Sequence, residues 1–150
     1  MTRLLFLILA FMSAAQPTQV VDLYTVHDLN AIEGQLAKGS PHFASRDLQQ
    51  YGNHYTMMAY RNATGSSEIH EHEADIFFIQ EGDAVIVTGG KMIGGHLTKP
   101  GELRGTFIEG GEKRPLKTGD IIHIPAGIAH QILITPGKPI AYFVVKVKGQ

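Results

Sequence analysis

The chain has 150 residues, a formal net charge of −1 and no cysteine. This length suits one domain with a core of its own, and a content of 43% hydrophobic and 18% charged residues is globular rather than disordered. Because there is no polybasic run, we expect no nucleic-acid partner and no binding to an anionic membrane. The lack of cysteine excludes disulfides, thiolate metal sites and a lipid anchor on cysteine.

The first 15 residues have the order of a secretory signal peptide. Arg3 supplies the positive charge, residues 4–12 form a short apolar run, and Ser13-Ala14-Ala15 offers a small-residue cleavage site near Ala15. Nine apolar residues are too few to span a bilayer, which needs about 20. We therefore expect a secreted or periplasmic protein without a membrane anchor after cleavage. The alternative interpretation is an N-terminal core helix.

An N-terminal extension over residues 16–54 follows the signal and contains one predicted helix. The stretch VHDLNAIEGQLAKG carries apolar side chains at helical spacing, namely Leu29, Ile32 and Leu36. Asp28 is the expected N-cap and Gly39 the expected stop. Residues 40–53 lack periodicity and are predicted to be a loop.

The remaining residues, 55–150, have the pattern of an all-β domain. Short runs such as ADIFFIQ, DAVIVTGG and IAYFVVKVK are punctuated by Gly, Pro and Asn every eight to twelve residues or so, which favours a sandwich or barrel. Residues 89–115 are rich in glycine and are expected to form an excursion between two hairpins. In the run DIFFIQ both faces are apolar, which favours a homodimer through Phe78 or Ile76.

Two histidines, His70 and His72, stand two apart just before an apolar run. On a strand such residues face the same side, so both imidazoles can converge on one point. Neutral imidazole suits Zn, Cu, Fe and Ni, although most such pairs are surface residues. The later stretch GDIIHIPAGIAHQILI adds His130, which shares the parity of Ile132 and Ile134 and should face the core. A buried histidine needs a hydrogen bond or a metal.

These two stretches resemble the two motifs of the cupin family. The first motif, G-x5-H-x-H-x3,4-E-x6-G, is matched by Gly65, His70, His72, Asp75 and Gly82. The second, G-x5-P-x-G-x2-H-x3-N, is matched by Gly119, Pro125, Gly127 and His130, with Ile134 in place of the asparagine. The resemblance covers roughly residues 55–147. It implies an all-β cupin jelly-roll barrel, the double-stranded β-helix, here preceded by a short N-terminal helix.

The resemblance implies that His70, His72 and His130 are metal ligands and that Asp75 is the fourth. Only two residues separate His72 from Asp75, where the motif has three or four, and strict alternation turns Asp75 away from the histidines. A bulge just before Asp75 would bring it back, and Glu68, which has the right parity, is the reserve ligand. We expect one divalent transition metal ion, with copper first and Fe, Mn, Zn or Ni as alternatives.

Because the fold hosts many reactions, three functions are open at this point. The first is an exported mononuclear oxidoreductase acting on a polysaccharide, an oligosaccharide or an aromatic compound. Copper leads there because small secreted cupins that this chain resembles include copper enzymes. The second is a non-redox isomerase, epimerase or lyase, in which Glu68, Tyr60 and Tyr142 would move protons. The third is a non-catalytic module that binds a metal or a sugar.

Overall fold

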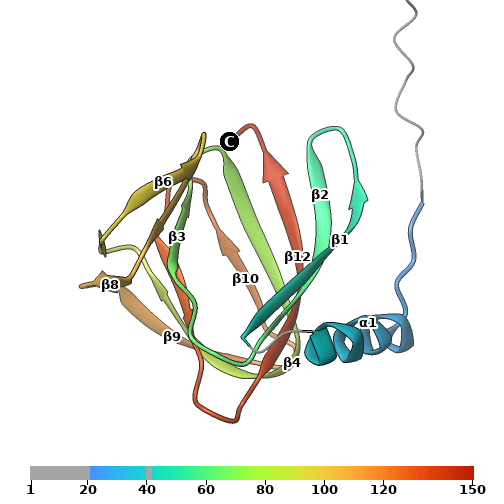
Figure 1. Ribbon diagram of the computed structural model, residues 1–150. Coiled ribbons are helices and arrows are strands. Elements are labelled where there is room, and N and C mark those ends of the chain that lie inside the picture. The colour runs from blue at the N-terminus through green and yellow to red at the C-terminus, as the bar shows by residue number, and fades with distance from the viewer. Residues whose placement is uncertain (1–20, 40–41) are drawn as a thin grey trace, which may run out of the picture.

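The computed structural model describes residues 21–39 and 42–150, so the predicted signal, residues 1–15, lies outside the described residues. One helix, α1 (Val26–Gly39), precedes twelve strands along the chain (Figure 1). The strands are β1 (Phe43–Gln50), β2 (His54–Arg61), β3 (Ser67–His70), β4 (Glu73–Thr88), β5 (Lys91–Ile93), β6 (His96–Lys99), β7 (Glu102–Gly105), β8 (Phe107–Glu109), β9 (Glu112–Lys117), β10 (Ile121–Ile124), β11 (His130–Leu133) and β12 (Ile140–Lys148).

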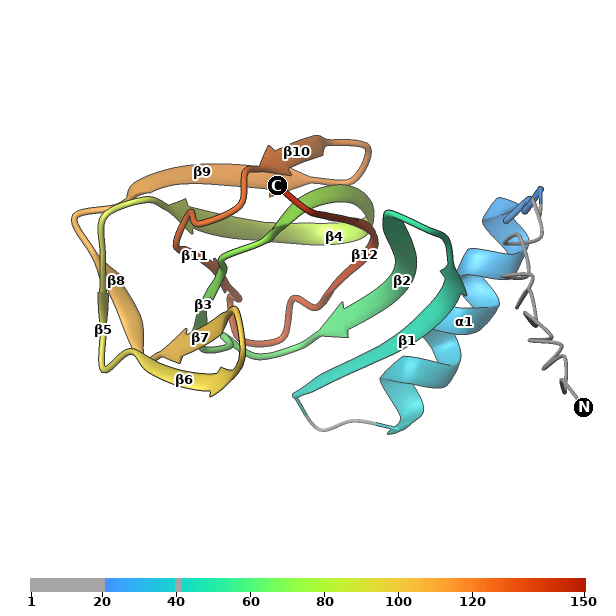
Figure 2. The same cartoon turned by 90° about the horizontal axis from the view of Figure 1, so that it is seen from above.

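Ten of the strands form one curved antiparallel sheet in the order β1-β2-β12-β4-β11-β3-β7-β6, with β9 and β10 paired to β4. The 16-residue strand β4 links the two halves of this sheet. Its first part pairs with β12 and β10, and its second part pairs with β9 and β11. Seen from above, the sheet curls into an open barrel (Figure 2). The predicted all-β barrel with a short N-terminal helix is confirmed.

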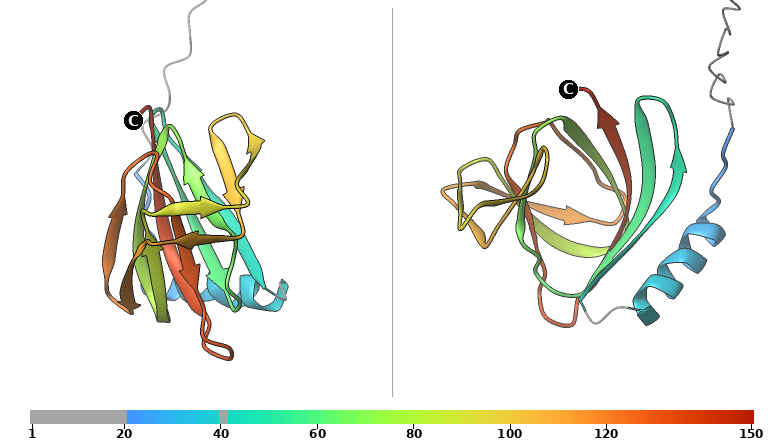
Figure 3. Two further views of the ribbon diagram at one scale, coloured as in Figure 1. Left: turned by 90° about the vertical axis from the view of Figure 1, so that its left-hand side faces the viewer. Right: turned by 45° about the horizontal axis from the view of Figure 1, so that its top comes forward.

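The glycine-rich excursion contains strands of its own. Strands β5 and β8 form a separate two-stranded sheet, which projects to one side of the barrel (Figure 3). Between them in the chain, β6 and β7 pair with each other, and β7 also pairs with β3. The excursion therefore adds strands to the barrel wall and is joined directly to β3, the strand that carries His70.

Side chains alternate along β2 and separate two apolar clusters. Ala59 faces the interior of the barrel and belongs to the larger cluster, which includes Ile86. Met58 and Tyr60 face the convex side of the sheet and pack with Ile32 of α1. Helix α1 thus covers the outside of β2, and the inside of the barrel is left to the core and the pocket described below. No helix in residues 21–39 and 42–150 is long and apolar enough to cross a membrane.

Helix α1 begins with a reciprocal capping box. The backbone N–H of Asp28 donates to Thr25 Oγ1 at 3.2 Å, and the backbone N–H of Thr25 donates to Asp28 Oδ2 at 2.9 Å. The prediction that Asp28 is the N-cap is therefore wrong, since Thr25 is the cap and Asp28 supplies the returning acceptor. The predicted end of the helix at Gly39 is confirmed.

Strand β1 lies in the segment that was predicted to be a loop. Its sequence, FASRDLQQ, lacks alternation because β1 is an edge strand that is exposed over much of its length. Backbone pairing with the apolar strand β2 makes it a strand, and a shift in register between Asp47 and Gln49 further obscures the period of two. The loop prediction is wrong because non-local pairing decides the structure of this segment.

Two glycines with positive φ provide a matched test of the fold. Gly82 sits where β4 passes between the halves of the sheet, with φ of 90°, and a Cβ added there would lie 2.1 Å from the carbonyl oxygen of Pro139. Gly119 has φ of 92°, but a Cβ there would meet nothing within 4 Å.

We expect Gly82→Ala to lower the free energy of unfolding by about 3 kcal/mol or more, because it adds a backbone clash to conformational strain. Gly119→Ala adds the strain alone and should cost about 1 kcal/mol. Urea unfolding of both variants measures the difference. Equal losses would contradict the close approach of Pro139 to Gly82.

Candidate metal centre

A pocket of about 410 Å³ lies inside the curved sheet. Strands β1, β2 and β12 supply one side of it, and β3, β4, β6 and β7 supply the other. Two of its lining residues, His70 and Asp75, are only 6% and 1% exposed. Ionisable side chains therefore lie at a depth in the barrel where a purely structural core would be apolar.

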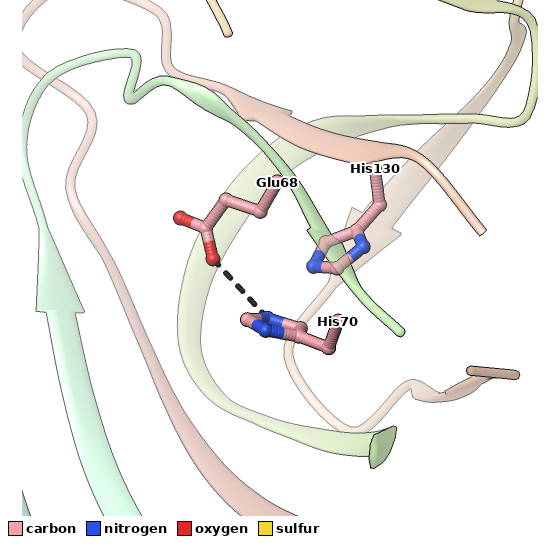
Figure 4. Close-up of side chains that lie close together, drawn as sticks. All are labelled: Glu68, His70 and His130. Atoms are coloured by element: carbon pink, nitrogen blue, oxygen red, sulfur yellow. Dashed lines mark ion pairs between the residues drawn. The ribbon is translucent and has the colours of Figure 1, made fainter. Parts of the chain in front are cut away.

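Three potential metal ligands, Glu68, His70 and His130, lie close together (Figure 4), and the first two of them line this pocket. One ligand atom of each lies within 4.8 Å of the other two. Glu68 and His70 alternate on β3 and so share a face, and His130 of β11 is the direct cross-strand partner of Glu68. The imidazole rings of His70 and His130 have their centroids 5.3 Å apart. Strand register therefore assembles the group.

Asp75 of β4 lies beside the two imidazoles of this group, although it is not among the three residues whose ligand atoms all lie within 4.8 Å of one another. Its Oδ2 lies 3.5 Å from Nε2 of His70 and 3.4 Å from Nε2 of His130. Oε2 of Glu68 also lies 3.5 Å from Nε2 of His70. Tetrahedral ligands held at about 2.1 Å from a metal ion are separated from one another by about 3.4 Å. These three separations are close to the spacing expected around such an ion.

Both imidazoles are oriented to present Nε2 to the centre. Nδ1 of His130 donates to the backbone carbonyl of Ile128 at 3.0 Å, and burial lowers the pKa of His130 despite the opposing charges of Asp75 and Glu68. The ring is therefore neutral, with the lone pair on Nε2. Nε2 of His70 is buried without a hydrogen-bond partner, which is costly unless a ligand binds it.

Glu68 divides its two oxygens between cations and the centre. Oε1 forms ion pairs with Arg61 at 3.1 Å and with Arg104, which leaves Oε2 facing His70. Burial opposes the charge of Glu68, but the neighbouring imidazole of His70 and the charges of Arg104 and Arg61 outweigh it and lower the pKa to about 2. Glu68 is thus ionised at neutral pH, which suits a metal ligand and does not suit a general acid.

The two oxygens of Asp75 are also divided between a cation and the centre. Lys146 lies directly opposite Asp75 in the pairing of β12 with β4, and its Nζ binds Oδ1 at 2.6 Å. Sequence reasoning missed this lysine, although it alternates with the buried Val144 in the apolar run IAYFVVKVK. An inward-facing lysine in such a run is a signal for a buried ion pair, because an unpaired buried ammonium is too costly.

The sequence carries no comparable signal for the two arginines that bind Glu68. Arg104 is the cross-strand partner of Glu68 in the pairing of β3 with β7, and Arg61 reaches Glu68 from β2 while its Nε donates to Tyr142 Oη at 2.9 Å. Both contacts depend on which strands become neighbours in the folded sheet. The sequence does not specify that adjacency.

The structure does not bring His72 to the other ligands. Strand β3 ends at His70, and residues 71 and 72 form a bend before β4, which interrupts the alternation that relates the two histidines. The side chain of His72 is exposed and lies against Gly101 in the turn between β6 and β7. The role of His72 as a ligand stays a prediction that this geometry does not support.

The same stretch matches the first cupin motif in part in a second register, in which Asn62 stands where the motif has its first glycine. If Glu68 and His70 stand for the two histidines, four residues separate His70 from Asp75, within the motif's three or four, and six still separate Asp75 from Gly82. No bulge is then needed before Asp75. The predicted bulge is indeed wrong, since β4 and β12 pair without interruption from Glu73 to Asp75.

The two tyrosines proposed as proton-transfer groups lie on opposite sides of the sheet. Tyr60 packs on the convex face with α1 and does not line the pocket, because it alternates with the inward-facing Ala59 and Arg61. Tyr142 does line the pocket, but burial raises its pKa and its hydroxyl accepts from Arg61. The structure brings Glu68 and Tyr142 to the site and leaves Tyr60 outside it.

Comparison with solved structures identifies the fold. A Klebsiella pneumoniae protein described as uncharacterized and conserved, with a double-stranded beta-helix domain, aligns with a TM-score of 0.59 at 14% identity, over 87% of this chain and 93% of that one. A putative mannose-6-phosphate isomerase from Ralstonia eutropha gives 0.53 at 17%, over 74% and 89%. A predicted oxalate decarboxylase from Thermotoga maritima gives 0.51 at 17%, over 71% and 80%.

No sequence-family profile and no curated protein sequence matches the chain. The structural likeness nevertheless agrees with the two sequence motifs. This chain has the double-stranded β-helix fold, as predicted.

We expect His70→Ala and His130→Ala each to reduce bound metal from about one equivalent to near zero, because each removes a nitrogen donor that faces the centre. His72→Ala is the matched control and should keep its metal, since His72 lies outside the group. Elemental analysis measures the metal, and circular dichroism verifies that the β-structure is retained. Metal loss in His72→Ala alone would contradict the assignment.

The low pKa of Glu68 gives the metal-free protein a defined acid sensitivity. A folded-state pKa of about 2, below the ordinary 4.5, contributes stability that is complete above about pH 4.5 and is lost as the pH falls towards 2. We expect Glu68→Gln to be less stable at neutral pH, because two arginines lose their partner, and to show a flatter stability curve across this acid range. Urea unfolding at several pH values tests this, and an unchanged slope would contradict it.

Proposed function

We propose that this chain is a mononuclear metal-dependent oxidoreductase whose ion is held by Glu68, His70, Asp75 and His130. The observation that carries the proposal is the convergence of two imidazole nitrogens and two carboxylate oxygens, with neighbouring donors 3.4 to 3.5 Å apart. Such a donor set fits a divalent transition metal. When bound, a redox metal of this kind supplies a Lewis acid and exchanges electrons with an oxidant.

The chain's own residues prepare the site by orienting the ligands. Arg61 and Arg104 fix Glu68, and Lys146 fixes Asp75, so each carboxylate keeps one oxygen free for the centre. The hydrogen bond from Nδ1 of His130 to a backbone carbonyl fixes the orientation of its ring, so that Nε2 faces the centre. Outer contacts of this type hold ligands in the geometry that binding requires, so little reorganisation accompanies binding.

The donor set favours iron over the copper that the sequence resemblance placed first. Two imidazoles with carboxylate oxygens are typical of non-haem iron sites, whereas three imidazoles would be softer and would suit copper better. The exposed position of His72 supports a centre with two imidazoles rather than three. We therefore expect iron to bind first among the redox metals.

The protonation states favour oxidation over isomerisation or elimination. Non-redox chemistry at a metal needs a side chain that exchanges protons near neutral pH. Glu68 has a pKa of about 2, and burial raises the pKa of Tyr142 above its ordinary value of 10.0. Both are therefore poor proton carriers at neutral pH, which supports electron exchange, as a bound redox metal would supply it, over proton transfer by these two side chains.

Two further predictions belong to the proposal. Residues 1–15 would direct the protein out of the cytoplasm, so that its oxidant and substrate are extracytoplasmic.

A homodimer would form through Phe78, which is 38% exposed and stands opposite Ile121, 63% exposed, on the outer face of the sheet. We expect Phe78→Ser to shift the mass in solution from dimer to monomer, as measured by light scattering.

Elemental analysis is the first test of the proposed function. The chain over residues 16–150, prepared without a histidine tag, is exposed to a mixture of Fe, Cu, Mn, Zn and Ni and then freed of unbound metal. We expect about one equivalent of iron, followed by oxygen or peroxide consumption in the presence of substrate.

Each other result has a distinct meaning. Zinc, nickel or manganese without oxidant consumption would favour the isomerase or lyase function, which is the kind of activity named for the Ralstonia eutropha protein. Absence of bound metal would favour a binding module and would defeat the proposal.

A further inference from the structure

The charges at the base of the pocket are balanced by the protein itself. Three cations and three carboxylates are packed there in mutual contact. Arg104 bridges Glu68 and Glu102, the latter at 2.6 and 2.8 Å, and Lys146 binds Asp75 at 2.6 Å. The remaining cation, Arg61, shares Glu68 with Arg104. No net charge is left at the base for a divalent ion to neutralise.

The charged side chains at the mouth of the pocket also balance one another. Lys99 and Lys148 line it together with Asp47 and Glu73. Lys148 lies near neutral groups, with its Nζ 3.4 Å from Gln50 Oε1 and 5.1 Å from the centroid of the Tyr55 ring. The hydroxyl of Tyr55 donates to Glu73 at 3.2 Å. The lining as a whole therefore carries equal numbers of cationic side chains and carboxylates.

We infer that this pocket takes a small organic acid, bound as its carboxylate anion. The inference rests on the proposed function, because it follows from adding a divalent ion to a lining whose own charges cancel. The ion brings two positive charges into a partly buried space, where uncompensated charge is costly. Each carboxylate group at the open side of the ion offsets one of these two charges, and a volume of about 410 Å³ suits a small molecule.

The pocket is less suited to the other candidate ligands. Phosphate groups are recognised by arginine forks that are free to donate, whereas Arg61 and Arg104 already donate to Glu68 and Glu102. A neutral sugar would leave the charge of the ion uncompensated. The chemistry of the lining thus favours a carboxylate over the carbohydrate that was expected from the sequence.

Binding calorimetry on the metal-loaded chain, residues 16–150, tests the inference without relying on activity. The probes are glycolate and oxalate, their neutral counterparts ethylene glycol and oxamide, inorganic phosphate, and cellobiose. We expect the two carboxylates to bind at least about tenfold more tightly than the neutral counterparts and to lose this advantage when the metal is removed.

Two mouth variants change the charge without touching a proposed ligand. Lys148→Met should weaken carboxylate binding about two- to fivefold, and Glu73→Gln should strengthen it by a similar factor. Neither should change the binding of the neutral probes. Lys138→Met is the matched control, because Lys138 is exposed in the turn between β11 and β12 and does not line the pocket.

Metal content, measured on every sample, separates the two proposals. Bound metal with no preference for carboxylates, or with tighter binding of cellobiose or phosphate, would overturn the inference and leave the metal centre standing. Absence of bound metal would overturn the proposed function and the inference with it. Opposite shifts for Lys148→Met and Glu73→Gln, with no shift for Lys138→Met, would support the inference.

Discussion

The site depends on the pairing of the four-residue strand β3 with β7 on one side and β11 on the other. This pairing sets Glu68 opposite both Arg104 and His130, and it sets His70 opposite Glu102. Because side chains alternate along a strand, a slip of one residue would turn Glu68 and His70 away from the pocket. The glycine-rich excursion supplies β7, so a segment without an obvious function in the sequence holds the ligands in register.

Charge compensation is the second constraint, and it follows from the first. Two carboxylates buried beside two imidazoles would repel one another and would be costly to desolvate. The register places a cation against each: Lys146 opposite Asp75 on β12, and Arg104 opposite Glu68 on β7. Glu68 remains ionised at neutral pH, and each carboxylate keeps one oxygen for the centre. The same pairings therefore stabilise the fold and prepare the ligands.

The sequence predicted the helix, the all-β barrel and, as ligands, His70, Asp75 and His130 with Glu68 in reserve, because local periodicity and motif spacing report on side-chain direction. It placed His72 among them by assuming that β3 continues past His70, and the bend at residues 71 and 72 ends that relation. The cations were not predicted, since strand adjacency is a non-local property. Only Lys146, a lysine at an inward position of an apolar strand, carried a local signal.

The balance of charge also separates folding from metal binding in this protein. Small metal sites made only of anionic ligands couple folding to metal binding, because the ligands repel one another until the ion arrives. Here the arginines and Lys146 already neutralise the carboxylates, so the barrel does not need an ion to fold. An ion that binds adds stability by mass action alone. Since its charge is not cancelled by the protein, it remains available to attract a ligand at its open side, which is a requirement for chemistry rather than for structure.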